Sequence, residues 1–139
     1  FPDRFRCAVS INAPTDLPRW LQDPDTAYSF NAGVREAFFG RNWAALKAAS
    51  PSLNGQPVQG PVLIVQAAND QLVPEQQGRE LRRALAAGPV QPEYLEVPGE
   101  GHARWLPGSY VKVFDRLEEF FTTNIYNYHV DVGETKVVK

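Results

Sequence analysis

Apolar residues along this chain form short runs typical of buried strands and longer stripes typical of helices. Residues 61–67 (PVLIVQA) contain four consecutive β-favouring apolar residues, which predicts a strand buried on both faces. Residues 6–12 (RCAVSIN) predict a short strand of the same buried type, and residues 93–97 (EYLEV) predict a third strand. We therefore expect three strands well separated along the chain.

Helical periodicity lies between and after these strands. Residues 74–87 place Gly78, Leu81 and Leu85 on one face, and Pro74 suits the first turn of that helix. Residues 109–124 predict a long amphipathic helix, whose apolar stripe is Tyr110, Val113, Phe114, Leu117, Phe120 and Phe121. Shorter helices are predicted at 17–21, with Asp16 as N-cap, at 34–39 and at 43–49. Residues 1–5, 23–33 and 50–61 are expected to be loops, and 125–139 to be a strand-like or mobile tail.

Strands that alternate with helices favour the α/β class, in which helices cover both faces of a parallel sheet. The chain has 139 residues, of which 43% are hydrophobic and 22% charged, as expected for one globular domain. A net charge of −2 offers no basic surface for nucleic acid, and no apolar run reaches the length of a membrane helix. The single Cys7 cannot form an internal disulfide and does not decide the compartment.

An acid and a histidine follow two of the predicted strands. Asp70 comes after the strand at 61–67, and His102 comes after the strand at 93–97. Because a right-handed crossover usually makes these strands parallel neighbours, both residues should leave the same carboxyl edge of the sheet. A carboxylate bonded to one imidazole nitrogen leaves the other nitrogen free to act as a base. Asp70 and His102 are therefore our candidate catalytic residues.

Plainer roles exist for these and other candidates. Asp70 by itself can stabilise its own turn, and His102 by itself can be a surface or core residue. We expect Glu100 to be a solvated turn residue, Cys7 to pack in a strand and His129 to be an exposed tail residue. Asp16, Trp20 and Trp105 can line a substrate pocket or simply cap and pack helices. No metal-ligand spacing, P-loop or Gly-x-Gly-x-x-Gly occurs, so no metal or other cofactor is indicated.

No serine of the chain lies in the Gly-x-Ser-x-Gly pattern of a nucleophile on a sharp turn. The five serines are Ser10, Ser29, Ser50, Ser52 and Ser109. Ser10 falls within a predicted strand, which is a poor place for a nucleophile. An acid–base pair is therefore predicted without the nucleophile that would complete a triad.

The chain resembles the C-terminal part of the α/β-hydrolase fold, and more narrowly the catalytic domain of the prolyl oligopeptidase family of serine peptidases. The matching residues are the opening FPDRF, Thr15-Asp16, Ala49-Ser50-Pro51, the run GPVLIV from Gly60, Asn69-Asp70, Val73-Pro74 and the Gly99-Glu100-Gly101-His102 turn. The resemblance implies that Asp70 is the triad acid and His102 the triad base. It departs from the family at Gln66-Ala67-Ala68 and at Ala103-Arg104-Trp105, and it does not cover the end of the chain.

The resemblance also sets our expectations for the whole protein. Residues 1–124 would be the C-terminal part of the catalytic domain, and 125–139 a tail. Peptides would be the substrate, and an N-terminal half of the same enzyme would supply the serine and the oxyanion hole. An esterase or dienelactone-hydrolase-like enzyme, or an inert interaction module, is the alternative. We expect the first strand to present an open edge, and the isolated chain to self-associate or to need its missing half.

Overall fold

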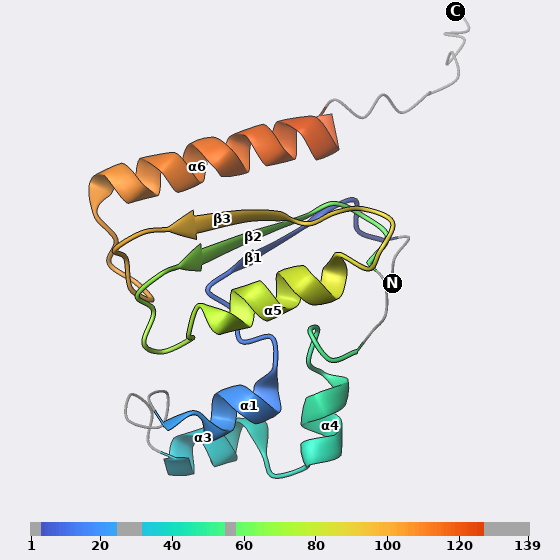
Figure 1. The fold of residues 1–139 in the computed structure, drawn as a ribbon, viewed down its shortest axis with the longest axis vertical. Helices are drawn as coiled ribbons and strands as arrows, with labels where there is room; N and C mark the ends of the chain where they lie inside the picture. Colours follow the sequence, from blue (N-terminus) through green and yellow to red (C-terminus); the bar gives the residue numbers. More distant parts are fainter. Residues whose placement is uncertain (1–3, 25–31, 55–57, 127–139) are drawn as a thin grey trace, which may run out of the picture.

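Three parallel strands form the sheet at the centre of the computed structural model, which describes residues 4–24, 32–54 and 58–126. They are β1 (Ala8–Ile11), β2 (Val62–Ala67) and β3 (Glu93–Val97), in the order β1-β2-β3 (Figure 1). Ile11 pairs with Val65, and Ala67 pairs with Val97. The three strands therefore end at one edge of the sheet, and the predicted α/β class is confirmed.

β2 is the central strand, and all its residues are buried. Its side chains alternate between two apolar clusters, as the period of a strand requires. Leu63 and Val65 point to the cluster on one face, and Val62 and Ile64 to the cluster on the other. The apolar run of β2 is continuous because helices cover both faces of the sheet at this strand.

Those two helices are α5 (Gln76–Leu85) and α6 (Pro107–Phe121), on opposite faces of the sheet (Figure 1). The buried face of α5 includes Gly78, Leu81 and Leu85, as predicted. Gly78 lies so close to β2 that a Cβ atom there would be 2.9 Å from Oε1 of Gln66. Glycine is therefore needed at this helix position because the helix approaches a buried side chain of the central strand.

The apolar stripe of α6 is wider than its contact with the sheet. Val113 and Phe120 are buried in the cluster with Leu63 and Val65, which confirms the predicted orientation of the helix. Phe114, which lies on the same predicted stripe, is 62% exposed. A three-stranded sheet is too narrow to cover the whole stripe, of which Val113 and Phe120 are buried while Tyr110 and Phe114 are exposed.

Three short helices connect β1 to β2: α1 (Leu17–Gln22), α3 (Ala32–Phe39) and α4 (Trp43–Ala48). Asp16 caps α1 as predicted, and its side chain accepts a hydrogen bond from the backbone N–H of Arg19. The buried Gln77 of α5 attaches this region to the sheet, since its Oε1 accepts from the backbone N–H groups of Thr15 and Asp16, each at 2.8 Å. The connection therefore has a defined place against α5.

Several helix starts differ from the predictions by two residues, which is within the usual uncertainty of helix ends. α3 begins at Ala32, inside the predicted loop, and α5 begins at Gln76, after Pro74. α6 begins at Pro107, and a π-helical turn, η1 (Thr122–Tyr126), follows it. The predictions for residues 1–3, for 25–31 of the second loop, for 55–57 of the third loop and for 127–139 of the tail lie outside the described residues.

β1 was expected to be a buried strand, and this is wrong. In the described part of the chain β1 pairs only with β2, and Ala8 and Ile11 are exposed. Because β1 has a neighbour at one edge only, its other edge is open, as expected.

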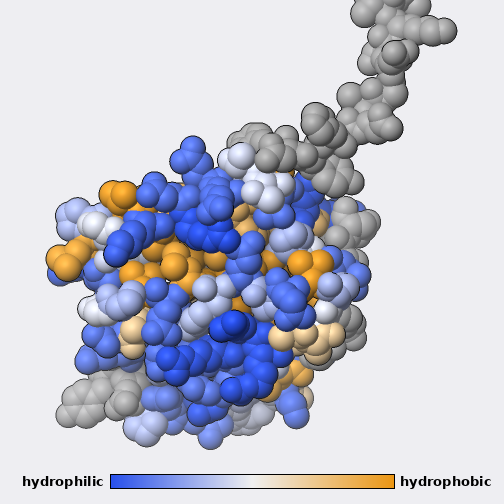
Figure 2. Space-filling model, turned by 45° about the horizontal axis from the view of Figure 1, so that its top comes forward, coloured by the Kyte–Doolittle hydropathy of each residue, from blue (hydrophilic) through white to orange (hydrophobic). Residues whose placement is uncertain are grey.

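Figure 2 shows apolar side chains gathered in a band across one face, with hydrophilic residues above and below it. Within the described residues no helix is long and apolar enough to cross a bilayer.

Candidate active site

Asp70 and His102 meet at the carboxyl edge of the sheet. The loops that carry them follow β2 and β3, whose last residues pair with each other. Two backbone bonds join the loops: the N–H of Ala68 donates to the carbonyl of Val97, and that of Asn69 to the carbonyl of Glu100. The ring Nδ1 of His102 lies 2.8 Å from Oδ2 of Asp70. The predicted proximity of the two side chains is therefore observed.

The carboxylate of Asp70 is held by its own turn as well as by the histidine. Its Oδ1 accepts from the backbone N–H groups of Leu72 at 2.9 Å and Val73 at 2.8 Å, which leaves Oδ2 for the imidazole. An ionised carboxylate only accepts hydrogen bonds, so with a neutral imidazole this contact places the proton on Nδ1 and leaves the lone pair on Nε2. The Asp70 side chain is fully buried while that of His102 is 39% exposed, so the arrangement can present a base to a bound molecule.

Glu100 is not the solvated turn residue that the sequence suggested. It is 7% exposed, and its Oε1 accepts from the backbone N–H of Leu106 at 3.1 Å and from Oγ of Ser109 at 2.6 Å. The N-cap position of α6 is Leu106, which has no side chain able to accept these bonds. The sequence carried no clear signal for this role, because the helix was predicted to begin at Ser109 and the apolar N-cap became evident only from the structure.

Trp105 packs rather than lining an open site. Only 9% of it is exposed, it lies in the apolar cluster with Val97 and Val113, and its ring is 5.5 Å from that of Tyr110. Its indole N–H donates to the carbonyl of Gly101 at 2.7 Å. Trp105 thus supports the turn that leads to His102.

Asn12 is a residue of the site that sequence reasoning missed. It follows β1 at the same sheet edge, is 5% exposed and donates from Nδ2 to the backbone carbonyl of His102 at 3.1 Å. Its Oδ1 accepts from the backbone N–H of Ala67 at 2.8 Å. The available signal was its position, since a polar residue that ends a strand at this edge can reach the neighbouring loops.

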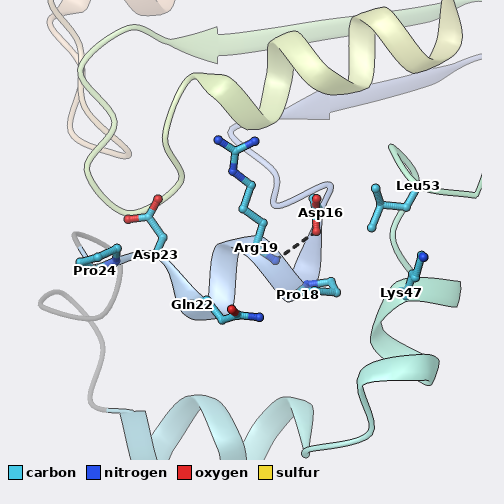
Figure 3. A pocket seen from close by; sticks show the side chains of 8 residues that line it. All are labelled: Asp16, Pro18, Arg19, Gln22, Asp23, Pro24, Lys47 and Leu53. Atoms are coloured by element: carbon cyan, nitrogen blue, oxygen red, sulfur yellow. Dashed lines mark hydrogen bonds between the residues drawn. The ribbon is translucent and has the colours of Figure 1, made fainter.

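Asp16 and Trp20 have the structural roles that were one of the two alternatives. Trp20 is buried, packs edge-on against Phe39 and donates from its indole N–H to the carbonyl of Leu72 at 2.7 Å. Asp16 caps α1 and also borders an open hollow of about 600 Å³ between α1 and α4 (Figure 3). The other residues around this hollow are Pro18, Arg19, Gln22, Asp23, Pro24, Lys47 and Leu53.

The described serines have structural partners or lie in the sheet. Ser50 is fully buried and donates to the carbonyl of Leu46, while Ser52 donates to the carbonyl of Thr15. Ser109 donates to Glu100, and Ser10 lies in β1. Ser29 and His129 are outside the described residues. Cys7 is half-buried against the apolar cluster that contains Leu63 and Val65, in keeping with a packing role. Among the described residues no group of His, Cys, Asp or Glu side chains could hold a metal ion.

Comparison with known proteins adds to this geometry. A model of the prolyl oligopeptidase family matches residues 1–127, which is most of the chain. The chain belongs to the prolyl oligopeptidase family. Dipeptidyl aminopeptidase BIII of Pseudoxanthomonas mexicana is 30% identical to it over 127 residues, covering 86% of this chain and 18% of the relative. The chain therefore spans less than a fifth of the length of that family member.

Solved structures of the prolyl oligopeptidase family share the fold. A puromycin-hydrolyzing peptidase of Mycobacterium tuberculosis superposes with a TM-score of 0.74 at 24% identity, over 86% of this chain and 18% of its own. The acylaminoacyl peptidase of Pyrococcus horikoshii gives 0.75 at 20% identity, over 92% and 21%. These likenesses confirm the predicted α/β-hydrolase fold class, with its parallel sheet flanked by helices.

Proposed function

We propose that this chain carries the acid and the base of a serine peptidase of the prolyl oligopeptidase family. The observation that supports the proposal is the 2.8 Å contact between Nδ1 of His102 and the buried carboxylate of Asp70, at the sheet edge where α/β proteins place their sites. Family membership narrows the chemistry from acid–base catalysis in general to acyl transfer. Peptides are the proposed substrates.

In this proposal His102 acts through Nε2. It takes the proton of a serine hydroxyl while the serine oxygen attacks the substrate carbonyl, and then donates that proton to the leaving amine. Asp70 holds the imidazole in the required tautomer and stabilises its protonated form. The serine and the backbone N–H groups of the oxyanion hole come from a segment outside this sequence. Residues 1–124 then form part of the catalytic domain, and 125–139 a tail.

The test uses the protein encoded by the whole gene and an active-site fluorophosphonate probe. We expect labelling of the wild type, and a loss of kcat on peptide substrates of about 10⁴-fold in Asp70→Asn and about 10⁶-fold in His102→Ala. Asn42→Ala, which alters only the cap of α4, is the matched control and should keep its activity. Full labelling of His102→Ala would sink the proposal.

A non-catalytic role of the 139-residue chain by itself is a second candidate, because no serine of the described residues is bonded to His102. In this candidate the chain is an inert or interaction module. Turnover of ester or peptide substrates by the isolated chain, above that of its His102→Ala variant, would exclude it. An esterase activity of the whole protein would appear in the same assays as turnover of esters without turnover of peptides.

A further inference from the structure

We propose that Asn12 is a positioning residue of the catalytic pair, which keeps the backbone of His102 at the distance from β2 that the bond to Asp70 requires. The catalytic role of this contact rests on the proposed function, whereas the hydrogen bonds of Asn12 do not depend on that proposal. Asp70 comes from β2 and His102 from β3, whereas Asn12 comes from β1. The site therefore draws on all three strands.

The chemistry of the two contacts fixes the orientation of the Asn12 amide. A backbone N–H, that of Ala67, must face an oxygen, and a backbone carbonyl, that of His102, must face an NH₂ group. Asn12 is 5% exposed, so water cannot easily replace either bond. An asparagine amide carries its acceptor and its donor on two separate atoms without a change of charge, which fits the residue type at this position.

The backbone of Asn12 supports the same conclusion. Its N–H donates to the carbonyl of Val65 and so continues the pairing of β1 with β2, but its φ is 45°. Among non-glycine residues asparagine is one of the few that tolerates this left-handed conformation. The turn ends β1 at the point from which the amide reaches across β2 to the His102 loop.

His102 is consequently held at two points. Asp70 holds its ring at Nδ1, and Asn12 holds its carbonyl. Backbone and indole bonds hold the rest of this loop at Val97, Glu100 and Gly101. Without the Asn12 contact the backbone of His102 itself can shift, while the side chain of Asp70 stays fixed in its own turn. A displacement of about 1 Å at a reacting group can cost on the order of 10²-fold in rate, so this bond is expected to matter for turnover more than for substrate binding.

Two variants of the whole protein separate the bonds from the backbone conformation. Asn12→Gly accepts the positive φ and removes both hydrogen bonds, while Asn12→Asp keeps the acceptor for Ala67 and places an oxygen against the carbonyl of His102. We expect kcat to fall about 10–100-fold in both variants, with KM changed by less than about threefold. We also expect the downfield proton NMR signal of His102 Nδ1–H to weaken through faster exchange with water.

Controls distinguish positioning from a general loss of stability. Leu85→Ala removes a buried side chain on the α5 face, and Asn42→Gly removes the cap of α4, both outside the contacts of His102. Neither control variant should weaken the Nδ1–H signal, and neither should lower kcat while leaving KM unchanged. If Asn12→Gly does not fold, Asn12→Asp still decides the question.

The outcomes separate this inference from the proposed function. An unchanged kcat and an unchanged Nδ1–H signal in folded Asn12 variants overturn the inference, even if the wild type is a labelled serine hydrolase. An equal kcat loss in Leu85→Ala also overturns it. If the wild type is never labelled, the proposed function fails. Even then, loss of the Nδ1–H signal in Asn12→Gly, with the signal kept in the controls, supports Asn12 as the residue that positions the pair.

Discussion

At the scale of single residues, the two carboxylate oxygens of Asp70 divide a structural contact and the proposed catalytic contact between them. One carboxylate oxygen closes its own turn through Leu72 and Val73, and the other faces His102. The turn makes the carboxylate rigid before the histidine reaches it, so little conformational entropy is lost when the pair forms. The plain and the functional interpretations of Asp70 are therefore compatible.

Tyr94 is a residue whose polar group has no such partner. Its hydroxyl is buried without a hydrogen bond of good geometry, although the Arg79 side chain is close enough to lower its pKa, and its ring lies 5.5 Å below the guanidinium of Arg82. Burial raises the pKa of the Tyr94 hydroxyl above its ordinary value. The neutral form therefore favours the folded state at neutral pH, and this contribution is lost as the pH rises from about 10 through the folded-state pKa.

We predict that Tyr94→Phe leaves the free energy of unfolding unchanged or raises it by up to about 1 kcal/mol, because the variant no longer buries an unpaired hydroxyl. Its stability should also fall less steeply above pH 10. Urea unfolding at pH 7 and pH 10.5 measures both effects. Tyr110→Phe, at a 39% exposed position, is the control. A loss of more than about 1 kcal/mol in Tyr94→Phe would show that the hydroxyl has a partner after all.

At the scale of elements, the turn between β3 and α6 is held by side chains that come from its own sequence. Glu100 serves the first turn of α6, and Trp105 donates to the carbonyl of Gly101. Gly99 adopts a φ of 76°, which glycine allows at little cost. The start of α6 and the position of His102 are consequently coupled through one short segment.

Replacing Glu100 should loosen both ends of this segment. We predict that Glu100→Ala lowers the free energy of unfolding by about 1–3 kcal/mol, since the N–H of Leu106 and the hydroxyl of Ser109 lose a buried acceptor. Glu100→Gln keeps an oxygen and should lose less. Glu118→Ala, at an exposed position of α6, is the matched control. Equal stabilities of Glu100→Ala and the control in chemical denaturation would contradict the capping role.

At the scale of the whole molecule, the sheet is open beside β1. Among the described residues β1 has β2 as its single neighbour, and Ile11 is 44% exposed. Further apolar residues are exposed at and before α6, namely Leu106, Val111 and Phe114. Unpaired strand edges next to apolar surface are sites of association between chains.

We therefore predict that the isolated 139-residue chain self-associates in a concentration-dependent manner, measured by analytical ultracentrifugation. Ile11→Lys should weaken the association, because a charge on an edge strand opposes pairing with another edge. Val34→Lys, at a 40% exposed position of α3, introduces the same charge away from the sheet and should not. A monomeric wild type that unfolds cooperatively would contradict the prediction.

Much of this architecture follows from local sequence. The run at β2 predicts its burial because only a strand covered on both faces is apolar at every position. The bounds of β3 and the buried face of α5 were predicted correctly because turn residues and helical periodicity surround them. Asp70 and His102 could be predicted as neighbours because one crossover between parallel strands determines where both loops emerge.

Tertiary structure alone decided the rest. Asn12 has a polar side chain like many surface residues, and only the meeting of distant segments gives it its partners. Glu100 finds its partners nearby, at Leu106 and Ser109, but only because the turn folds back on the start of α6. Phe114 and the two end residues of β1 belong to apolar patterns like those of buried elements, yet they are exposed because the three described strands present too little surface to cover them. Periodicity and turn chemistry act over a few residues, whereas the bond from Asn12 to His102 depends on how the whole sheet is assembled.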